Sequence, residues 1–243
     1  MAAEFALSAD DYATVKHTLA ATDSLLRNGY PGDFGNRQPV HTVYVAADRY
    51  QASLPKQWGQ DALVAVNEHG GVARLCSILG IGEDLGEQVA AKVTAKLECE
   101  PIEDLRLDFE DGYGDRGDDR EDADVRASAR AVSAAVASGQ APPFIGIRFK
   151  SLEETTRVRG LRTLDLFVST LLSAGGLPDG LVLTLPKVST VAQVRAMVSV
   201  CQRLEAAHGL EPGRLRFEVQ VETTQLILGA DGTVPVAQLL HQS

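Results

Sequence analysis

Short apolar runs alternate with longer helical patterns over most of the chain. Each run is rich in Val, Ile, Leu and Phe, and successive runs start 39, 37 and 35 residues apart. The runs begin at Leu105, Phe144, Leu181 and Arg216. Between them, apolar residues at helical spacing predict helices over 122–137, 161–173 and 191–208. Strands that alternate with helices in this way are typical of parallel β/α units.

The region before these units has a different pattern. Ser8 and Asp11 form a capping-box pattern at the start of a helix predicted over 8–27, and turn residues fill 28–39. A first strand is predicted over 41–46. Residues 57–98 are mostly helical in pattern, with a break at two consecutive glycines. We therefore expect an N-terminal helical extension over 1–40 and a partial β/α-barrel domain over 41–243.

Ionisable residues follow the ends of four consecutive predicted strands. Glu110 and Asp111 follow the second strand, Arg148 ends the third, Lys187 follows the fourth and Glu222 follows the fifth. An open doubly wound sheet collects its ligand groups at one switch point, whereas a β/α barrel gathers them from all strands at one mouth. The pattern therefore predicts an α/β fold of the (β/α)8 TIM-barrel type, with about five of the eight units in this chain.

Composition excludes several classes of function. The chain of 243 residues has 44% hydrophobic residues and a formal net charge of −10, which argues against a nucleic-acid-binding surface. No apolar run approaches the ~18 residues that a membrane span needs, and the N-terminus lacks the pattern of a signal peptide. Three scattered cysteines indicate neither a disulfide framework nor a metal motif. We expect a cytoplasmic protein that contacts neither nucleic acid nor membrane.

The segment LRLDFEDGYG, at 105–114, crowds the carboxylates of Asp108, Glu110 and Asp111 at the end of an apolar strand. Such crowding requires compensation by a cation, a metal ion or bound protons. Arg148 and Lys187 can supply part of the positive charge, and a hard divalent ion would supply more. The acidic segment that follows, at 115–124, we interpret as a solvated loop in which some residues cap the next helix.

Four segments together resemble the signature segments of the aldolase/citrate lyase family. In chain order they read LRLDFEDGYG, FIGIRFK, LVLTLPKVST and RFEVQVETTQLI, each at the end of a predicted strand. That family includes citrate lyase beta subunits and malyl-coenzyme A lyases, on a pyruvate/phosphoenolpyruvate type of barrel. The resemblance covers about residues 40–230, and the motifs are specific only as a set.

The resemblance implies a role for each matching residue. Glu222 matches the glutamate that binds Mg²⁺ directly, and Arg148 matches the arginine that holds the carboxylate of a keto acid. Glu110 and Asp111 match the acidic pair that orders metal-bound waters and neighbouring cations. Lys187 belongs to the Leu-Pro-Lys segment, and the general base has no counterpart that the sequence identifies.

The resemblance also implies an activity. We expect a Mg²⁺-dependent carbon–carbon lyase or aldolase that cleaves a small anionic hydroxy acid, or its coenzyme A thioester, through a metal-stabilised enolate. Arg49 corresponds to the position where the family contacts coenzyme A, although AADR departs from the usual Pro-Gly-x-Arg turn. The full-length protein is expected to form a homo-oligomer.

Alternative interpretations remain open at this point. Arg148 could simply pair with Asp108 or Glu110, and Lys187 could form a structural ion pair. A sixth strand would start near residue ~252 if units of this size continued, whereas the sequence ends at Ser243. We therefore expect a fragment or a truncated member that lacks the family's second metal ligand. A non-catalytic protein, or a phosphoenolpyruvate-utilising or mutase-type barrel enzyme, are the competing functions.

Overall fold

The computed structural model describes residues 6–30, 32, 33 and 35–240 and divides into two compact units, Met1–Gln38 and Pro39–Ser243. In the first unit, α1 runs from Ala9 to Gly29. Asp11 N donates to Ser8 Oγ at 3.3 Å and Ser8 N donates to Asp11 Oδ2 at 2.7 Å. The predicted capping box therefore starts this helix, since it satisfies backbone N–H groups that have no partner within the helix.

The second unit is built on a parallel five-stranded sheet whose order, β1-β2-β3-β4-β5, is the order of the chain. The strands are β1 (Val43–Ala46), β2 (Asp104–Asp108), β3 (Phe144–Arg148), β4 (Leu181–Leu185) and β5 (Phe217–Val219). Each begins within two residues of its predicted start. The prediction of an α/β fold with parallel strands is confirmed, because local apolar runs of this length and composition specify buried parallel strands.

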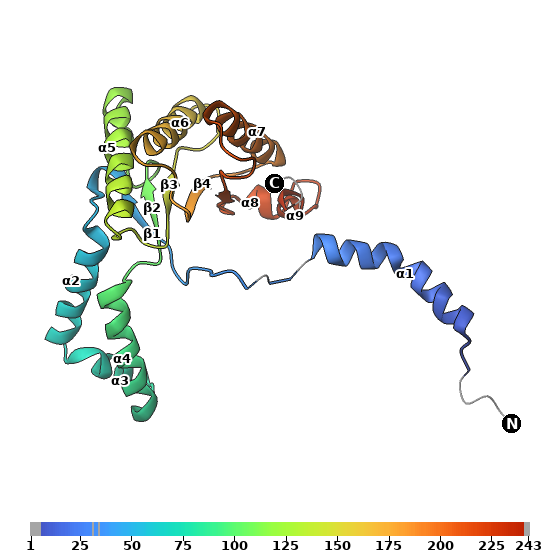
Figure 1. Ribbon diagram of the computed structural model, residues 1–243, viewed down its shortest axis with the longest axis horizontal. Helices are drawn as coiled ribbons and strands as arrows, with labels where there is room; N and C mark the ends of the chain where they lie inside the picture. The colour runs from blue at the N-terminus through green and yellow to red at the C-terminus, as the bar shows by residue number, and fades with distance from the viewer. Residues whose placement is uncertain (1–5, 31, 34, 241–243) are drawn as a thin grey trace. The chain divides into compact units, whose positions relative to one another are not determined.

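Helices fill the connections between the strands (Figure 1). Between β1 and β2 lie η1 (Ala47–Arg49), α2 (Leu54–Glu68), α3 (Gly71–Ile78) and α4 (Glu83–Cys99). The crossovers that follow contain α5 (Asp118–Ala137), α6 (Arg157–Ala174) and α7 (Val191–His208), and after β5 come α8 (Thr224–Ile227) and α9 (Pro235–Leu239). The bounds of α7 are those predicted from the sequence. None of the helices described is both long and apolar enough to span a bilayer.

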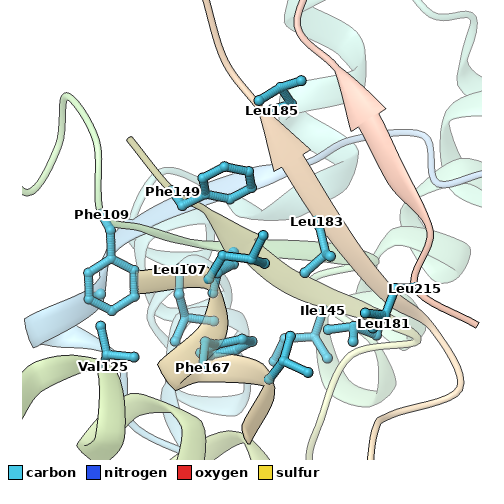
Figure 2. Packing of buried hydrophobic residues seen from close by; sticks show 14 of the residues in the cluster. Leu107, Phe109, Val125, Ile145, Phe149, Phe167, Leu181, Leu183, Leu185 and Leu215 are labelled. Atoms are coloured by element: carbon cyan, nitrogen blue, oxygen red, sulfur yellow. The ribbon is translucent and has the colours of Figure 1, made fainter. Parts of the chain in front are cut away.

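One face of the sheet is apolar and packs against α5, α6 and α7. Leu107 of β2 and Ile145 of β3 are almost fully buried beside Val125 of α5 and Phe167 of α6, as Figure 2 shows. Side chains alternate between the two faces of a strand, so every second residue of each strand enters this core. The core therefore fixes the register of the strands. The register in turn sets which residues of neighbouring strands lie side by side on the opposite face.

The opposite face of the sheet carries polar side chains that are also buried. Arg106 of β2, only 1% exposed, donates from Nε to Thr184 Oγ1 of β4 at 2.9 Å and to Glu218 Oε1 of β5 at 3.1 Å. It also pairs with Asp104. Its Cα partner in β3 is Gly146, which has no side chain, so the guanidinium has room to cross β3. This face is a charged layer below the carboxyl ends of the strands.

Candidate functional site

Lys187 joins the predicted site residues of three strands. Its side-chain Nζ pairs with Glu110 and with Asp111 Oδ1, the latter at 2.8 Å, and its backbone N–H donates to Glu222 Oε1 at 2.7 Å. Lys187 is the one non-glycine residue with positive φ in the part of the chain that the structure describes, at 51°. Backbone strain of this kind persists where the surroundings impose it, and it is concentrated at functional sites.

The charges around Lys187 determine its protonation. Hydrogen bonds to Asp111 and Glu110 raise the pKa of the Lys187 ammonium well above its ordinary value of 10.5. The hydrogen bond from Lys187 lowers the pKa of Asp111, whereas burial raises the pKa of Glu110. Lys187 therefore stays a cation at neutral pH, and its chemistry is that of a fixed positive charge rather than of a nucleophilic amine.

Arg148 is held by Asp108, one of the two partners proposed for it as an alternative to substrate binding. Arg148 Nε donates to Asp108 Oδ1 at 2.8 Å and Nη2 donates to Oδ2 at 2.6 Å. The same carboxylate accepts the backbone N–H groups of Glu110, at 2.9 Å, and Gly112, at 2.7 Å. Asp108 therefore orients both Arg148 and the loop that carries Glu110 and Asp111, which we call the acidic loop. The sequence signal was a carboxylate at the last position of an otherwise apolar strand.

Arg148 also stacks on an aromatic ring, and some of its guanidinium N–H groups are not used by Asp108. Its Cζ lies 4.6 Å from the centroid of the Tyr44 ring of β1. A guanidinium carries five N–H donors, and Asp108 uses Nε and one hydrogen of Nη2. The remaining N–H groups can bind the carboxylate of a ligand while Asp108 and Tyr44 keep the planar group in place.

The Glu110 carboxylate has one unsatisfied oxygen. Its Oε2 is buried and has no hydrogen-bond partner among the residues that the structure describes, and it lies 3.8 Å from Arg148 Nε. A buried acceptor without a donor is costly, and in native proteins it commonly marks a place that water, an ion or a ligand completes. Glu110 thus places one oxygen on the Lys187 ammonium and leaves the other, without a hydrogen bond, beside the Arg148 guanidinium.

The donor set fits a hard cation such as Mg²⁺, as far as this chain supplies ligands. Glu110 Oε2 and the second oxygen of the exposed Glu222 are without partners among the described residues. Within those residues no group of three or more His, Cys, Asp or Glu side chains is arranged to hold a metal. Since Mg²⁺ usually binds one or two carboxylates and keeps several waters, Glu110 and Glu222 are the residues of this chain that would hold it.

Arg49 lies outside this arrangement. It is exposed on η1, and no contact in the described part of the chain joins it to the residues around Lys187. Its neighbour Asp48 pairs instead with Arg116, whose Nη1 donates to Asp48 Oδ2 at 2.6 Å. Five of the six predicted site residues are therefore connected through contacts at the strand ends, and Arg49 is separate from them.

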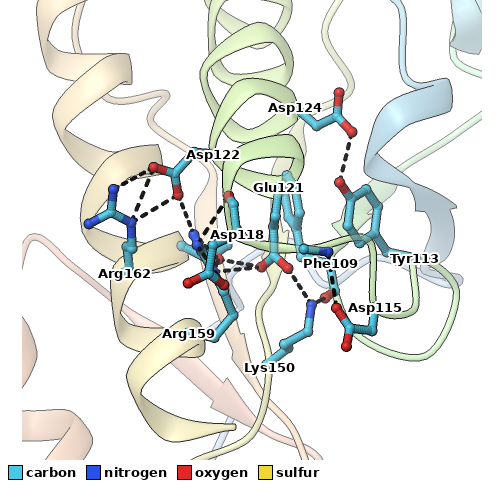
Figure 3. A network of polar contacts seen from close by, with 12 residues as sticks. Phe109, Tyr113, Asp115, Asp118, Glu121, Asp122, Asp124, Lys150, Arg159 and Arg162 are labelled. Atoms are coloured by element: carbon cyan, nitrogen blue, oxygen red, sulfur yellow. Dashed lines mark hydrogen bonds and ion pairs between the residues drawn. The ribbon is translucent and has the colours of Figure 1, made fainter.

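A second ionic network contacts the start of the acidic loop at Phe109 and extends into α5 and α6 (Figure 3). Lys150 Nζ donates to the Phe109 carbonyl at 2.9 Å and to Glu121 Oε2 at 2.5 Å. Arg159 and Arg162 both donate to Asp122 Oδ1, at 2.6 Å and 3.0 Å. The interpretation of 115–124 as a solvated loop is wrong for Glu121 and Asp122, which are 2% and 6% exposed near the start of α5. Cations from α6 and from the segment after β3 compensate these buried carboxylates.

Comparison with known proteins identifies a family without an assigned activity. No curated protein matches the chain. One family model covers residues 19–243, which is most of the chain and includes every strand and every residue of the site around Lys187. This chain therefore belongs to the family described as domain of unknown function DUF6986.

Proposed function

We propose that the site around Lys187 belongs to a carbon–carbon lyase or aldolase similar to the aldolase/citrate lyase family. The observation that carries this proposal is the contact of Lys187 with Glu110, Asp111 and Glu222. Residues from three of the four segments that resemble family motifs are thereby joined beyond the carboxyl ends of β2, β4 and β5, and Arg148 of the remaining segment lies 3.8 Å from Glu110. A small anionic hydroxy acid, or its coenzyme A thioester, is the proposed substrate. A role for Arg49 in binding coenzyme A remains a prediction.

The proposed architecture is a β/α barrel. Sequential strand order and crossover helices on one face of the sheet both support it, because a doubly wound sheet reverses its order and covers both faces. The buried polar face around Arg106 would then line the barrel interior, below the mouth. Family members with this architecture place their substrates at the same end of the strands as Glu110 and Arg148.

Arg148 has the binding role in this proposal. Its unused N–H groups would hold the carboxylate of a keto or hydroxy acid in two hydrogen bonds, with Asp108 as the positioning residue. Holding the substrate in a fixed orientation lowers the entropic part of the barrier to bond cleavage. The stacking of the guanidinium on Tyr44 limits its movement further.

Breaking a carbon–carbon bond next to a carbonyl leaves negative charge on the carbonyl oxygen. The Lys187 ammonium is a permanent positive charge beside the substrate region, and it stabilises such charge without transferring a proton. Glu222 and the free oxygen of Glu110 would hold Mg²⁺ through direct or water-mediated contacts. When bound, the ion supplies Lewis-acid stabilisation of the same oxygen. The chain's own residues thus orient the acid and surround the developing charge.

A screen for aldol cleavage tests the proposal. The chain is incubated with Mg²⁺ and a panel of hydroxy acids and their coenzyme A thioesters, and released pyruvate, glyoxylate or a similar acid is measured. Binding of oxamate, a pyruvate analogue, is measured by calorimetry in the same buffer. Arg148→Lys should weaken oxamate binding by about tenfold, because lysine cannot form the two-pronged contact. Arg130→Lys, at an exposed position of α5, is the matched control.

Two results together would overturn the proposal. One is the absence of product from every substrate of the panel. The other is oxamate binding that is unchanged, or equally absent, in the parent chain and in Arg148→Lys. Loss of oxamate binding in Arg148→Lys with a melting temperature equal to that of the control would assign the effect to the site rather than to folding.

A second candidate function is non-catalytic association. It is favoured by the observation that Arg148 and Lys187 already have carboxylate partners in the chain, at Asp108 and at Glu110 with Asp111. Ion pairs of this kind can serve the fold alone. Under this alternative, Lys187→Met lowers stability and leaves oxamate and Mg²⁺ binding undetectable in both proteins.

A further inference from the structure

Within the unit Met1–Gln38, the helix α1 leaves an apolar stripe uncovered. Tyr12, Val15, Leu19 and Leu26 are between 46% and 59% exposed, and no described residue of α1 is buried. Most helical stability in proteins comes from packing of an apolar face rather than from helix propensity. The capping box alone is worth about 1 kcal/mol. This stripe therefore needs a partner surface.

The spacing of the stripe indicates that the partner is another helix. Tyr12, Leu19 and Leu26 are separated by seven residues, and Val15 lies three residues after Tyr12. Apolar residues at alternating steps of three and four form the narrow seam by which two helices pack side by side. In the same register Thr22 and Gly29 continue the positions of Val15. The seam thus alternates large residues with small ones toward its C-terminal end.

We propose that α1 pairs with α1 of a second copy of this chain in antiparallel orientation. In the register that places Leu19 opposite Thr22 of the other copy, Val15 lies opposite Leu26, and Tyr12 lies opposite Gly29. Each layer then combines a larger side chain with a smaller one, which fills the seam without overpacking. Because the pairing has two-fold symmetry, every such contact forms twice.

The charges beside the seam fit the same orientation. Lys16 and Asp23 lie on one flank of the stripe, and neither has a hydrogen-bond or ion-pair partner among the described residues. Antiparallel pairing at this register brings Lys16 of each copy next to Asp23 of the other. Parallel pairing would instead place Lys16 next to Asp11, whose carboxylate already accepts hydrogen bonds from Ser8. Charge complementarity therefore selects a second copy, in antiparallel orientation, as the occupant.

Sedimentation equilibrium of the full chain over a range of concentrations tests the pairing. We expect a concentration-dependent dimer. Leu19→Asp should weaken dimerisation on the order of a hundredfold, because two leucines lose their burial at once. Ala20→Asp introduces the same charged residue one position away, outside the seam, and should leave the dimer intact. A chain that is monomeric at all concentrations, or a dimer equally strong in both variants, would overturn the proposal.

Charge reversal tests the orientation. Lys16→Asp and Asp23→Lys should each weaken the dimer several-fold, because two opposite-charge contacts become two like-charge contacts. The double variant Lys16→Asp/Asp23→Lys restores both contacts with exchanged signs and should recover the parent association constant. Failure of the double variant to recover it would contradict antiparallel pairing. Circular dichroism of each variant shows whether α1 remains helical.

Discussion

Asp108 and Arg148 end two neighbouring strands and join them through a two-pronged contact, with Nε–Oδ1 at 2.8 Å and Nη2–Oδ2 at 2.6 Å. The two residues are also Cα partners in the register of β2 and β3. Asp108 is 2% exposed and accepts two backbone N–H groups of the acidic loop as well. One carboxylate thus fixes both a cation of the candidate site and the loop that carries Glu110.

Replacing Asp108 by asparagine should destabilise the protein strongly. The amide cannot accept both guanidinium hydrogen bonds, and the largely buried Arg148 loses its countercharge, so we expect a loss of about 3 kcal/mol in the free energy of unfolding. Urea denaturation measures this. Asp84→Asn, at an exposed position in the first turn of α4, should change stability by less than about 0.5 kcal/mol. Equal effects of the two substitutions would contradict the role assigned to Asp108.

Glycine at position 187 should be more stable than alanine. The backbone of Lys187 has a φ of 51°, a conformation that costs a residue with a Cβ roughly 1 kcal/mol and costs glycine little. Both variants lose the same side-chain contacts with Glu110 and Asp111. The free energy of unfolding of the Lys187→Gly variant, measured by urea denaturation, should therefore be about 1 kcal/mol higher than that of the Lys187→Ala variant.

The same comparison inside a helix supplies the control for position 187. Ala196 is an exposed residue of α7, and Ala196→Gly should lower stability by about 1 kcal/mol. The preference for glycine over alanine is then opposite in sign at the two positions. A lower stability of the glycine variant at position 187 would show that its left-handed backbone is not retained in solution.

Lys150 and Glu121 should be energetically coupled. Their contact of 2.5 Å is shielded from solvent, with side chains 13% and 2% exposed. A double-mutant cycle with Lys150→Met and Glu121→Gln should give a coupling of about 2 kcal/mol, because Glu121→Gln removes the carboxylate that pairs with the buried Lys150 ammonium and Lys150→Met leaves Arg159 as the cation that pairs with Glu121. The pair Arg120 and Asp124, at 2.8 Å within α5, should give about 0.5 kcal/mol or less in the same cycle, because the Arg120 side chain is 59% exposed and solvent screens it. Equal couplings would contradict the prediction.

Asp122 should contribute to the loss of stability in acid. Hydrogen bonds from Arg162 and then Arg159 hold the pKa of Asp122 at about 2, below its ordinary 3.8. Since the pKa is lower in the folded state, the stabilisation is complete above the unfolded value and is lost as the pH falls from about 4 through about 2. Because Arg162 is 56% exposed and solvent screens the pair, we expect a loss on the order of 1 kcal/mol.

The measurement for Asp122 is urea denaturation at a series of pH values between about 5 and 2. The parent chain should lose more stability over this window than Asp122→Asn, which has no charge to lose at this position. Parallel curves for the two proteins would exclude Asp122 as a source of the acid sensitivity. Asp119→Asn, in the same acidic turn of α5, serves as the control for the effect of net charge.

The local pattern determined much of the fold. Apolar runs fixed the starts of the five strands to within two residues, the helical spacing fixed α7, and Ser8 with Asp11 fixed the start of α1. These features depend on residues that are near in sequence, where side-chain period and capping act directly. Parallel strands also place their carboxyl ends at one edge of a sheet. The gathering of Glu110, Arg148 and Lys187 therefore followed from the order of elements.

Only the tertiary structure decided which charges pair and which are buried. Glu121 and Asp122 belong to an acidic run that reads as solvated, yet cations from other elements surround them in the fold. The contact of Arg106 with Thr184 depends on strand register and on a glycine in the strand between them. Such contacts require atoms within about 3 Å across distant segments. The sequence by itself determined the elements and their periodicity, whereas packing of the sheet against its helices decided the partners of each charged side chain.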